Sequence, residues 1–134
     1  MTLKRREFLA SAAAAIAAPV SMIALVQSGG AMYGLISKMS AVMGKRDELV
    51  AILLESVGAM PGCLSYIVAT DSTDEQVIWI TEVWDSKASH DASLTLPAVK
   101  AAIARGRPLI AAFGSGTVTT PVGGYGLPAT GRTG

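Results

Sequence analysis

The order of periodic segments between residues 32 and 122 is the feature that most constrains how this chain can fold. Stretches in which apolar and polar residues alternate are typical of strands, and apolar residues spaced three and four apart are typical of a helix. The pattern predicts strands over residues 32–42, 63–69, 76–84 and 117–122. It predicts helices over residues 46–60 and from Ser86 to Ser93 or Leu94, with a further helical turn or two over residues 97–105.

Local signals place the ends of these elements. Asp85-Ser86 is an N-cap signal for the second helix, and Pro61-Gly62 is expected to end the first. Gly114-Ser115-Gly116 is expected to be a turn before the last strand. The resulting β-α-β-β-α-β order predicts an α+β, ferredoxin-like domain, in which a four-stranded antiparallel sheet carries its helices on one face.

The expected strands are apolar on both of their faces. Alternate residues of a strand point to opposite faces. Cys63, Ile67 and Val77 are therefore expected on one face, and Val68 and Ile78 on the other. A sheet with helices on one face only would leave the second apolar face in water. We therefore expect a second copy of the chain to cover it, which gives a symmetric homodimer and a dimeric α/β barrel.

The first 31 residues are expected to be an export signal. A basic start, Lys4-Arg5-Arg6, precedes a stretch without ionisable side chains over residues 8–31, and small residues allow cleavage after Ala31. The paired arginines followed by Glu7-Phe8-Leu9 resemble a twin-arginine signal, which would place the protein in the periplasm or outside the cell. Two alternatives stay open. The segment is retained as a membrane anchor, or translation starts at Met32 and the protein is cytoplasmic.

The expected organisation is thus a signal at residues 1–31, one domain at residues 32–122, and a flexible glycine-rich tail at residues 123–134. Three of the eleven Lys and Arg residues and one of the ten acidic residues precede residue 32, which leaves eight basic and nine acidic residues for the rest. Such a nearly neutral body does not predict nucleic-acid binding. One Cys excludes an intrachain disulfide, and one Cys with one His cannot complete a zinc, iron or copper site.

Four stretches of the body together resemble the antibiotic biosynthesis monooxygenase superfamily. They are Gly44-Lys45-Arg46-Asp47-Glu48-Leu49, Met60-Pro61-Gly62-Cys63-Leu64-Ser65-Tyr66, Thr81-Glu82-Val83-Trp84-Asp85-Ser86-Lys87-Ala88-Ser89-His90 and Leu96-Pro97-Ala98-Val99. The resemblance covers roughly residues 32–122. It implies a small dimeric enzyme that oxidises a small phenolic, quinol or anthrone-like aromatic with O₂, without metal, flavin or haem. The protein would supply an apolar cavity, a group that assists proton removal, and donors that hold the developing anion.

Five side chains are candidates for the site that the resemblance implies. His90 and Glu82 are the candidate catalytic residues, because histidine changes charge near neutral pH and a carboxyl among apolar neighbours has a raised pKa. Trp84, Tyr66 and Trp79 are candidates for substrate binding. Trp84 and Trp79 have opposite parity, so we expect them on opposite faces of the sheet. Each candidate also has a structural alternative: a surface or capping role for His90, a rim ion pair for Glu82, and packing for the aromatic residues.

The sequence also departs from the superfamily in ways that bear on function. Ser93 stands nine residues after Trp84, where members frequently have a second His. This departure favours an alternative function, a non-catalytic dimeric barrel that binds an apolar small molecule. The haem-degrading branch of the superfamily is not favoured, because the first strand has no Asn and the helix over residues 97–105 has no His to ligate iron.

Overall fold

A computed structural model of the chain describes residues 30–55 and 57–128. The chain divides into two units, Met1–Ala31 and Met32–Gly134, and all the elements below belong to the second. The expected export signal lies outside the described residues except for its last two, and so do residues 129–134 of the expected tail. Within residues 30–55 and 57–128, no helix is long and apolar enough to cross a membrane.

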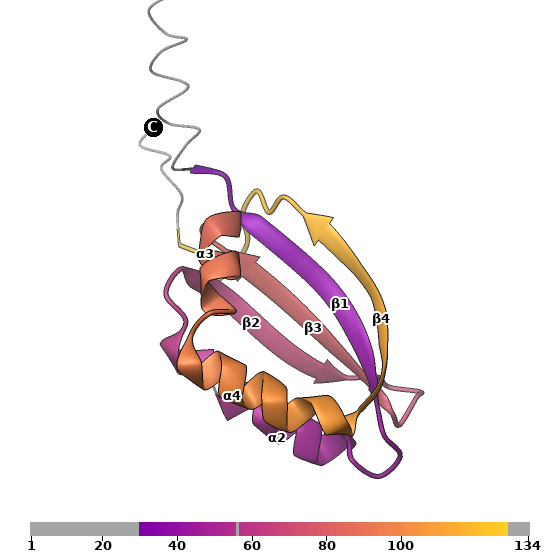
Figure 1. The fold of residues 1–134 in the computed structure, drawn as a ribbon. Coiled ribbons are helices and arrows are strands. Elements are labelled where there is room, and N and C mark those ends of the chain that lie inside the picture. The colour runs from indigo at the N-terminus through magenta and orange to yellow at the C-terminus, as the bar shows by residue number, and fades with distance from the viewer. Residues whose placement is uncertain (1–29, 56, 129–134) are drawn as a thin grey trace, which may run out of the picture. The chain divides into compact units, whose positions relative to one another are not determined.

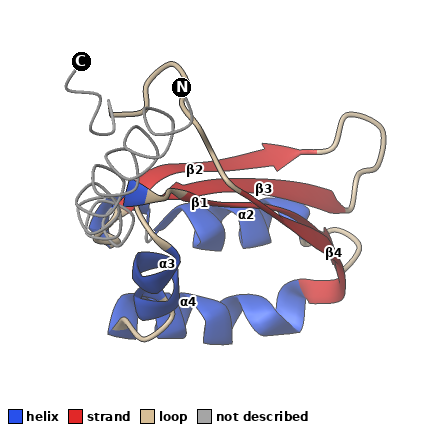
Figure 2. Ribbon diagram, turned by 90° about the horizontal axis from the view of Figure 1, so that it is seen from above, coloured by secondary structure: helices blue, strands red, loops and turns tan. Residues whose placement is uncertain are grey.

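The structure confirms the ferredoxin-like α+β fold. The strands are β1 (Tyr33–Ala41), β2 (Cys63–Thr70), β3 (Val77–Trp84) and β4 (Ile110–Thr119), and they form one antiparallel sheet in the order β2-β3-β1-β4. The helices are α2 (Arg46–Glu55), α3 (Lys87–Ser93) and α4 (Pro97–Gly106), with short 3-10 turns at Val57–Ala59 and Arg107–Leu109. Figure 1 shows the sheet with its helices, and Figure 2 shows all three helices on the same face of it.

The core lies between the sheet and the helices. Ala41 of β1, Leu49 of α2, and Ile78 and Ile80 of β3 form its buried cluster. Leu49 and Ile78 are almost fully inaccessible, at 1% and 0% exposed. Leu49 and Ile52 are three residues apart on α2, which is the spacing that brings side chains to one face of a helix. The apolar stripe expected for this helix therefore does pack against the sheet.

The first helix is shorter than its apolar spacing predicts. It ends at Glu55 instead of Met60, and residues 57–59 form a 3-10 turn. Two residues explain the early end. Gly58 is a poor helix former, and Pro61 disfavours helical backbone at the residue before it. Apolar spacing alone overestimates a helix whose last expected turn contains such residues.

The last strand differs from the prediction. β4 begins at Ile110 and continues through Gly114-Ser115-Gly116 to Thr119, so the expected turn is wrong. The expected last strand exists, but it begins seven residues earlier than residue 117 and ends at Thr119 instead of residue 122. Ser37 pairs with Gly116 and Met39 pairs with Phe113, which leaves two residues of β4 opposite the single residue Lys38. This is a β-bulge. A Cβ atom on Gly114 would lie 2.5 Å from Lys38 Cγ, so the glycine serves close strand approach and not a turn.

A second bulge changes the face that Cys63 occupies. Cys63 pairs with Trp84 but Ser65 pairs with Val83, so the alternation is interrupted at Leu64. Cys63 therefore lies on the helix-covered face with Trp84, and the expectation that it shares a face with Ile67 is wrong. Alternation counted along a single strand cannot reveal such an insertion, because the bulge is defined by the pairing with β3.

The face of the sheet away from the helices carries exposed apolar side chains. Ile36 of β1, Ile67 of β2 and Trp79 of β3 are 41%, 55% and 37% exposed. Ile36 and Ile67 both pair with Thr81, two residues from Trp79 on the same strand face. We call Ile36, Ile67 and Trp79 the open-face cluster. Trp84 is only 1% exposed and lies on the opposite, helix-covered face, as the parity of the two tryptophans predicts.

Candidate functional site

A cavity of about 390 Å³ lies between the sheet and the helices. Apolar side chains make up most of its lining, among them Leu35, Leu49, Ile52, Ile80, Val99 and Ile103. The polar side chains of its lining are few, and they are Ser37, Tyr66, Glu82, His90, Ser93 and Arg107. An apolar hollow with a few polar groups is the usual form of a small-molecule site.

A second hollow, of about 690 Å³, lies on the surface between the loop after β1 and the loop between β2 and β3. Its lining includes Arg46, Asp47, Asp74 and Glu75. The last three of these are exposed to water. None of the five candidate side chains lines it, and volume alone does not make it the better candidate.

Glu82 is the carboxyl group of the cavity. It lies on β3 between Leu35 of β1 and Tyr66 of β2, and its side chain is 13% exposed. Its Oε2 atom is buried and has no hydrogen-bond partner among the described residues. Burial raises the pKa of the Glu82 carboxyl above its ordinary value, against smaller opposite effects of His90 and the Trp84 indole. Glu82 can therefore hold a proton under conditions in which an exposed glutamate is ionised.

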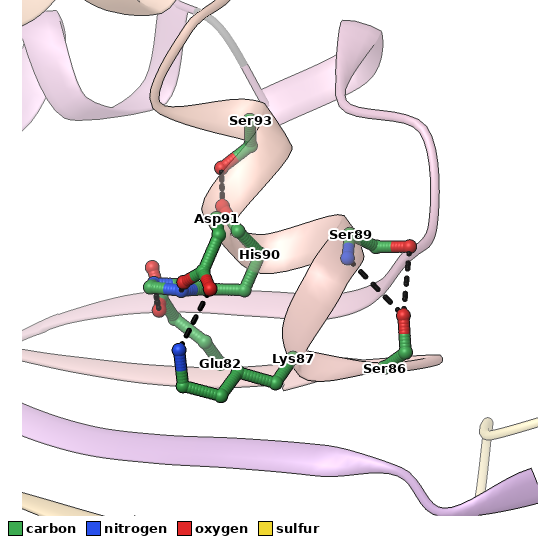
Figure 3. Close-up of polar contacts among 7 residues, drawn as sticks. All are labelled: Glu82, Ser86, Lys87, Ser89, His90, Asp91 and Ser93. Carbon is green, nitrogen blue, oxygen red and sulfur yellow. Dashed lines mark hydrogen bonds and ion pairs between the residues drawn. The ribbon is translucent and has the colours of Figure 1, made fainter. Parts of the chain in front are cut away.

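His90 is brought to Glu82 by the start of helix α3. Ser86 caps this helix, because its Oγ accepts a hydrogen bond from the Ser89 backbone N–H at 3.1 Å. His90 follows one turn later, and its side chain is 15% exposed. Its Nε2 atom lies 3.7 Å from Glu82 Oε2, and its Nδ1 atom lies 3.1 Å from Asp91 Oδ1 (Figure 3). The two candidate catalytic residues thus meet at the cavity wall.

Two aromatic rings hold the imidazole in place. The Trp84 ring meets it edge to face, with centroids 5.5 Å apart and an interplanar angle of 82°. The Tyr33 ring is tilted against it, with centroids 5.0 Å apart and an interplanar angle of 41°. Tyr33 and Trp84 are paired residues of β1 and β3, so one point of the sheet supplies both contacts. The imidazole therefore has little room to turn.

Tyr66 and Trp84 both line the cavity with Glu82. Burial, together with the nearby charges of Glu82 and Cys63, raises the pKa of the Tyr66 hydroxyl well above its ordinary value. Tyr66 therefore stays a neutral phenol that can donate a hydrogen bond. The Trp84 Nε1 atom is buried and has no hydrogen-bond partner within the described part of the chain.

Trp79 is the one candidate that the structure does not bring to the cavity. It points to the open face of the sheet, where its Nε1 donates a hydrogen bond to Asp71 Oδ2 at 2.8 Å. The Lys38 ammonium lies 5.3 Å from the centre of its ring, which is a cation–π contact. A role of Trp79 in the cavity is therefore not supported by its position.

The sequence did not predict the contacts that three residues make with His90. Ser93 is 4% exposed, lines the cavity, and donates a hydrogen bond through Oγ to the His90 carbonyl oxygen at 2.6 Å. Its spacing of three from His90 on one helix was an available signal. Tyr33 and Asp91 also contact the imidazole. Pairing between β1 and β3 was needed to place Tyr33, and a side-chain rotamer was needed to place Asp91.

The cysteine and the metal-binding groups offer no further site. Cys63 is half-buried, and its Sγ lies 3.7 Å from the Ser65 carbonyl oxygen. Burial, helped by the charge of Glu82, raises the pKa of the Cys63 thiol, which disfavours the reactive thiolate. No group of three or more His, Cys, Asp or Glu side chains gathers as a metal site in residues 30–55 and 57–128.

Comparisons with known proteins agree with this architecture. A family model described as antibiotic biosynthesis monooxygenase matches residues 32–105. The crystal structure of a proposed antibiotic biosynthesis monooxygenase from Chloroflexus aurantiacus J-10-fl is 62% identical, covers 72% of this chain and 99% of that one, and has a TM-score of 0.70. None of the curated proteins matches the chain.

More distant structures share the fold. One from Caulobacter crescentus CB15 is 24% identical, covers 69% of this chain and 90% of its own, and has a TM-score of 0.58. One from Bacteroides thetaiotaomicron VPI-5482 is 17% identical, covers 68% of this chain and 90% of its own, and has a TM-score of 0.61. Both are described as proposed antibiotic biosynthesis monooxygenases.

Proposed function

Because this chain belongs to the antibiotic biosynthesis monooxygenase family, we propose that it oxidises a small phenolic, quinol or anthrone-like aromatic with O₂ and no cofactor. The observation that carries the proposal is the contact between Glu82 and His90 in the wall of a mostly apolar cavity of about 390 Å³. An apolar cavity suits an aromatic ring and dissolved O₂, and the pair supplies the proton acceptor that such a substrate needs.

The reaction balances without an external reductant. The site removes a proton from the substrate, and the resulting anion gives one electron to O₂. Recombination of the substrate radical with superoxide forms a carbon–oxygen bond and a peroxide. In an anthrone-like substrate the O–O bond then breaks, the ring CH₂ becomes a carbonyl group, and the second oxygen leaves as water with two protons. The net change is CH₂ plus O₂ to C=O plus H₂O.

The polar groups of the cavity have separate roles in this scheme. His90 and Glu82 together accept the substrate proton and return it to the leaving oxygen. The Tyr66 hydroxyl is a neutral donor for the developing substrate anion. Trp84, at 1% exposed, forms the rigid wall that fixes the imidazole. Trp79 has no part in the reaction, because it lies on the open face.

The open-face cluster supports a homodimer. Ile36, Ile67 and Trp79 expose apolar surface across three neighbouring strands, and a second copy of the sheet would cover it. Light scattering on purified protein should give twice the chain mass. A monomer at micromolar concentration would contradict this part of the proposal.

Export through the twin-arginine pathway is proposed from Arg5-Arg6 and the uncharged segment that follows. Mass spectrometry of the protein from its native cells tests this. A chain that begins at Met32 is expected both after cleavage behind Ala31 and after a translation start at Met32. The cell fraction separates these two cases, because the cleaved protein is expected in the periplasm or outside the cell and the other in the cytoplasm. A chain that keeps residues 1–31 in the membrane fraction indicates a retained anchor.

The direct test of the reaction is O₂ uptake. Chelator-treated protein is mixed with a panel of quinols, naphthols and anthrones under a Clark electrode, and products are identified by mass spectrometry with ¹⁸O₂. We expect uptake with at least one substrate class and one labelled oxygen in the product. Absence of uptake across the panel, with the protein folded, would contradict the proposal.

Ser93 favours a second candidate function, the non-catalytic binding of an apolar small molecule. It lines the cavity at the position where members of the superfamily frequently have a further histidine, and its hydroxyl already donates a hydrogen bond to the His90 carbonyl oxygen. The variants His90→Gln and Glu82→Gln separate the two functions, with the exposed Glu48→Gln as matched control. An enzyme loses turnover in the first two and keeps ligand binding, whereas a binding protein shows no O₂ uptake in any of the four proteins.

A further inference from the structure

Four side chains form a line of neighbouring polar groups from the cavity to the surface. Glu82 Oε2 lies 3.7 Å from His90 Nε2, His90 Nδ1 lies 3.1 Å from Asp91 Oδ1, and Asp91 Oδ2 lies 2.7 Å from Lys87 Nζ (Figure 3). Side-chain exposure rises along the line, from 13% at Glu82 and 15% at His90 to 52% at Asp91 and 68% at Lys87. The line therefore connects a buried carboxyl group with water.

From this line we propose that Asp91 is a positioning residue, which fixes His90 as the Nδ1–H tautomer so that Nε2 receives the proton of the cavity from Glu82. An ionised carboxylate can only accept hydrogen bonds, so the contact between Asp91 Oδ1 and His90 Nδ1 requires a proton on Nδ1. A neutral imidazole with a proton on Nδ1 has a free lone pair on Nε2. That lone pair faces Glu82 Oε2.

Asp91 is suited to this task because it stays ionised. The hydrogen bond from Lys87, followed by the one from His90, lowers the pKa of the Asp91 carboxyl. Lys87 and Asp91 are four residues apart on α3, the spacing at which helix side chains meet. Lys87 thus holds the carboxylate charged and in place, while the Tyr33 and Trp84 rings restrict the imidazole.

Glu82 completes the arrangement from the cavity side. Its Oε2 atom is buried and has no hydrogen-bond partner among the described residues, and His90 Nε2 lies 3.7 Å from it as an acceptor for a protonated Glu82. The gap of 3.7 Å must close by roughly half an ångström to give a hydrogen bond. The proton then passes from the carboxyl oxygen to Nε2, and the imidazolium that forms keeps its Nδ1 proton in the hydrogen bond to the ionised Asp91 carboxylate. One proton leaves the cavity, and no electron moves.

The tautomer can be read directly, because the chain contains a single histidine. Long-range ¹H–¹⁵N spectra of untagged, ¹⁵N-labelled protein report which ring nitrogen carries the proton. We expect the Nδ1–H form to dominate in the wild type. Asp91→Ala should shift the population toward the Nε2–H form, whereas Asp91→Asn, whose amide oxygen can still accept, should keep Nδ1–H. Asp47→Ala is the matched control, because its side chain is 94% exposed and lies on α2.

The consequence for turnover rests on the proposed function, whereas the tautomer does not. In a working enzyme Asp91→Ala should lower kcat at least about tenfold with little change in KM, and Asp91→Asn should restore most of it. Amide spectra of each variant establish that it is folded. An Nε2–H wild type, or identical ring-nitrogen shifts in the wild type and Asp91→Ala, overturns the tautomer assignment. If the tautomer of Asp91→Ala shifts but its kcat equals that of Asp47→Ala, the positioning of His90 by Asp91 does not matter for turnover, and that part of the proposal is overturned. A wild type without O₂ uptake overturns only the proposed function.

Discussion

Each face of the sheet carries a tryptophan next to a carboxyl group, and the two pairs differ in almost every other respect. On the helix-covered face, Glu82 lies two residues from Trp84, is 13% exposed, and has a raised pKa because it is buried. On the open face, Asp71 accepts a hydrogen bond from Trp79 Nε1 at 2.8 Å and two more from the Thr73 and Asp74 backbone N–H groups. These hydrogen bonds hold the pKa of Asp71 far below its ordinary range, and the bond from Trp79 has the largest effect.

The difference shows what makes a carboxyl group available for chemistry. The Asp71 carboxylate accepts hydrogen bonds from backbone N–H groups of its own turn, so it stabilises the β2–β3 hairpin and stays ionised. Glu82 Oε2 and Trp84 Nε1 are buried with no partner in the described part of the chain. Unpaired polar atoms in a cavity cost stability, and they are retained where they serve a ligand or a proton. Four substitutions test this contrast.

The largest expected effect is on stability, from truncating the two tryptophans. Trp84→Ala removes a side chain that is 1% exposed, leaves a cavity in its place, and should lower the free energy of unfolding by about 3–5 kcal/mol. Trp79→Ala should cost only about 1 kcal/mol in the monomer, because its ring is 37% exposed and one hydrogen bond is lost. Urea titrations followed by circular dichroism measure both. Equal losses would show that the open face is as tightly packed as the core.

The next effect is on turnover. Glu82→Gln keeps the shape of the side chain but removes its proton-accepting group, so kcat should fall by about 100-fold. Asp71→Asn should leave kcat unchanged, because the hydrogen-bond partners of its side chain among the described residues are Thr73, Asp74 and Trp79, which do not line the cavity. Initial rates of O₂ uptake under substrate saturation compare the two. A similar loss in both variants would mean that the open face takes part in the reaction.

A smaller effect is the pH dependence that Glu82 gives to stability. Its pKa is raised in the folded state, so its contribution is fully present below the unfolded pKa, near 4.5, and is lost as the pH rises through the folded pKa. Glu82→Gln removes this loss. The variant should be more stable than the wild type at pH 8, and this difference should disappear as the pH falls to 4. Denaturant titrations across this range would contradict the assignment if the difference were independent of pH.

The smallest effect concerns Asp71 and has the opposite sign. Its pKa is lowered in the folded state, so its contribution is present above the unfolded pKa and is lost as the pH falls through the folded pKa. Asp71→Asn should therefore flatten the decline of Tm below about pH 4, with only a small change at pH 7 because the group is exposed. Thermal melts at several acidic pH values measure this. If Tm falls with decreasing pH in the same way in Asp71→Asn and in the wild type, the hydrogen bond between Trp79 and Asp71 is not maintained in solution.

Local patterns were sufficient for the order of the elements and for part of the site. The alternation of β3 placed Glu82 and Trp84 on one face and Trp79 on the other, and Ser86 marked the start of α3. What the sequence did not predict depends on residues that meet only in the fold. Gly114 is required by Lys38 on the neighbouring strand, and Cys63 changes face because of its pairing with Trp84. The contacts of His90 with Tyr33 and Asp91 likewise depend on strand pairing and on rotamers.

The bulges affect more than local register, because they lie in the two outer strands of the sheet. β2 is irregular at Leu64, and β4 is irregular opposite Lys38 and again at Ala111. An outer strand that stays regular offers a row of unpaired N–H and C=O groups on which further chains can stack into fibrils. A kink breaks that row and twists it away from a straight template. The same glycine that fits beneath Lys38 thus helps to protect this small, apolar sheet from amyloid-like growth.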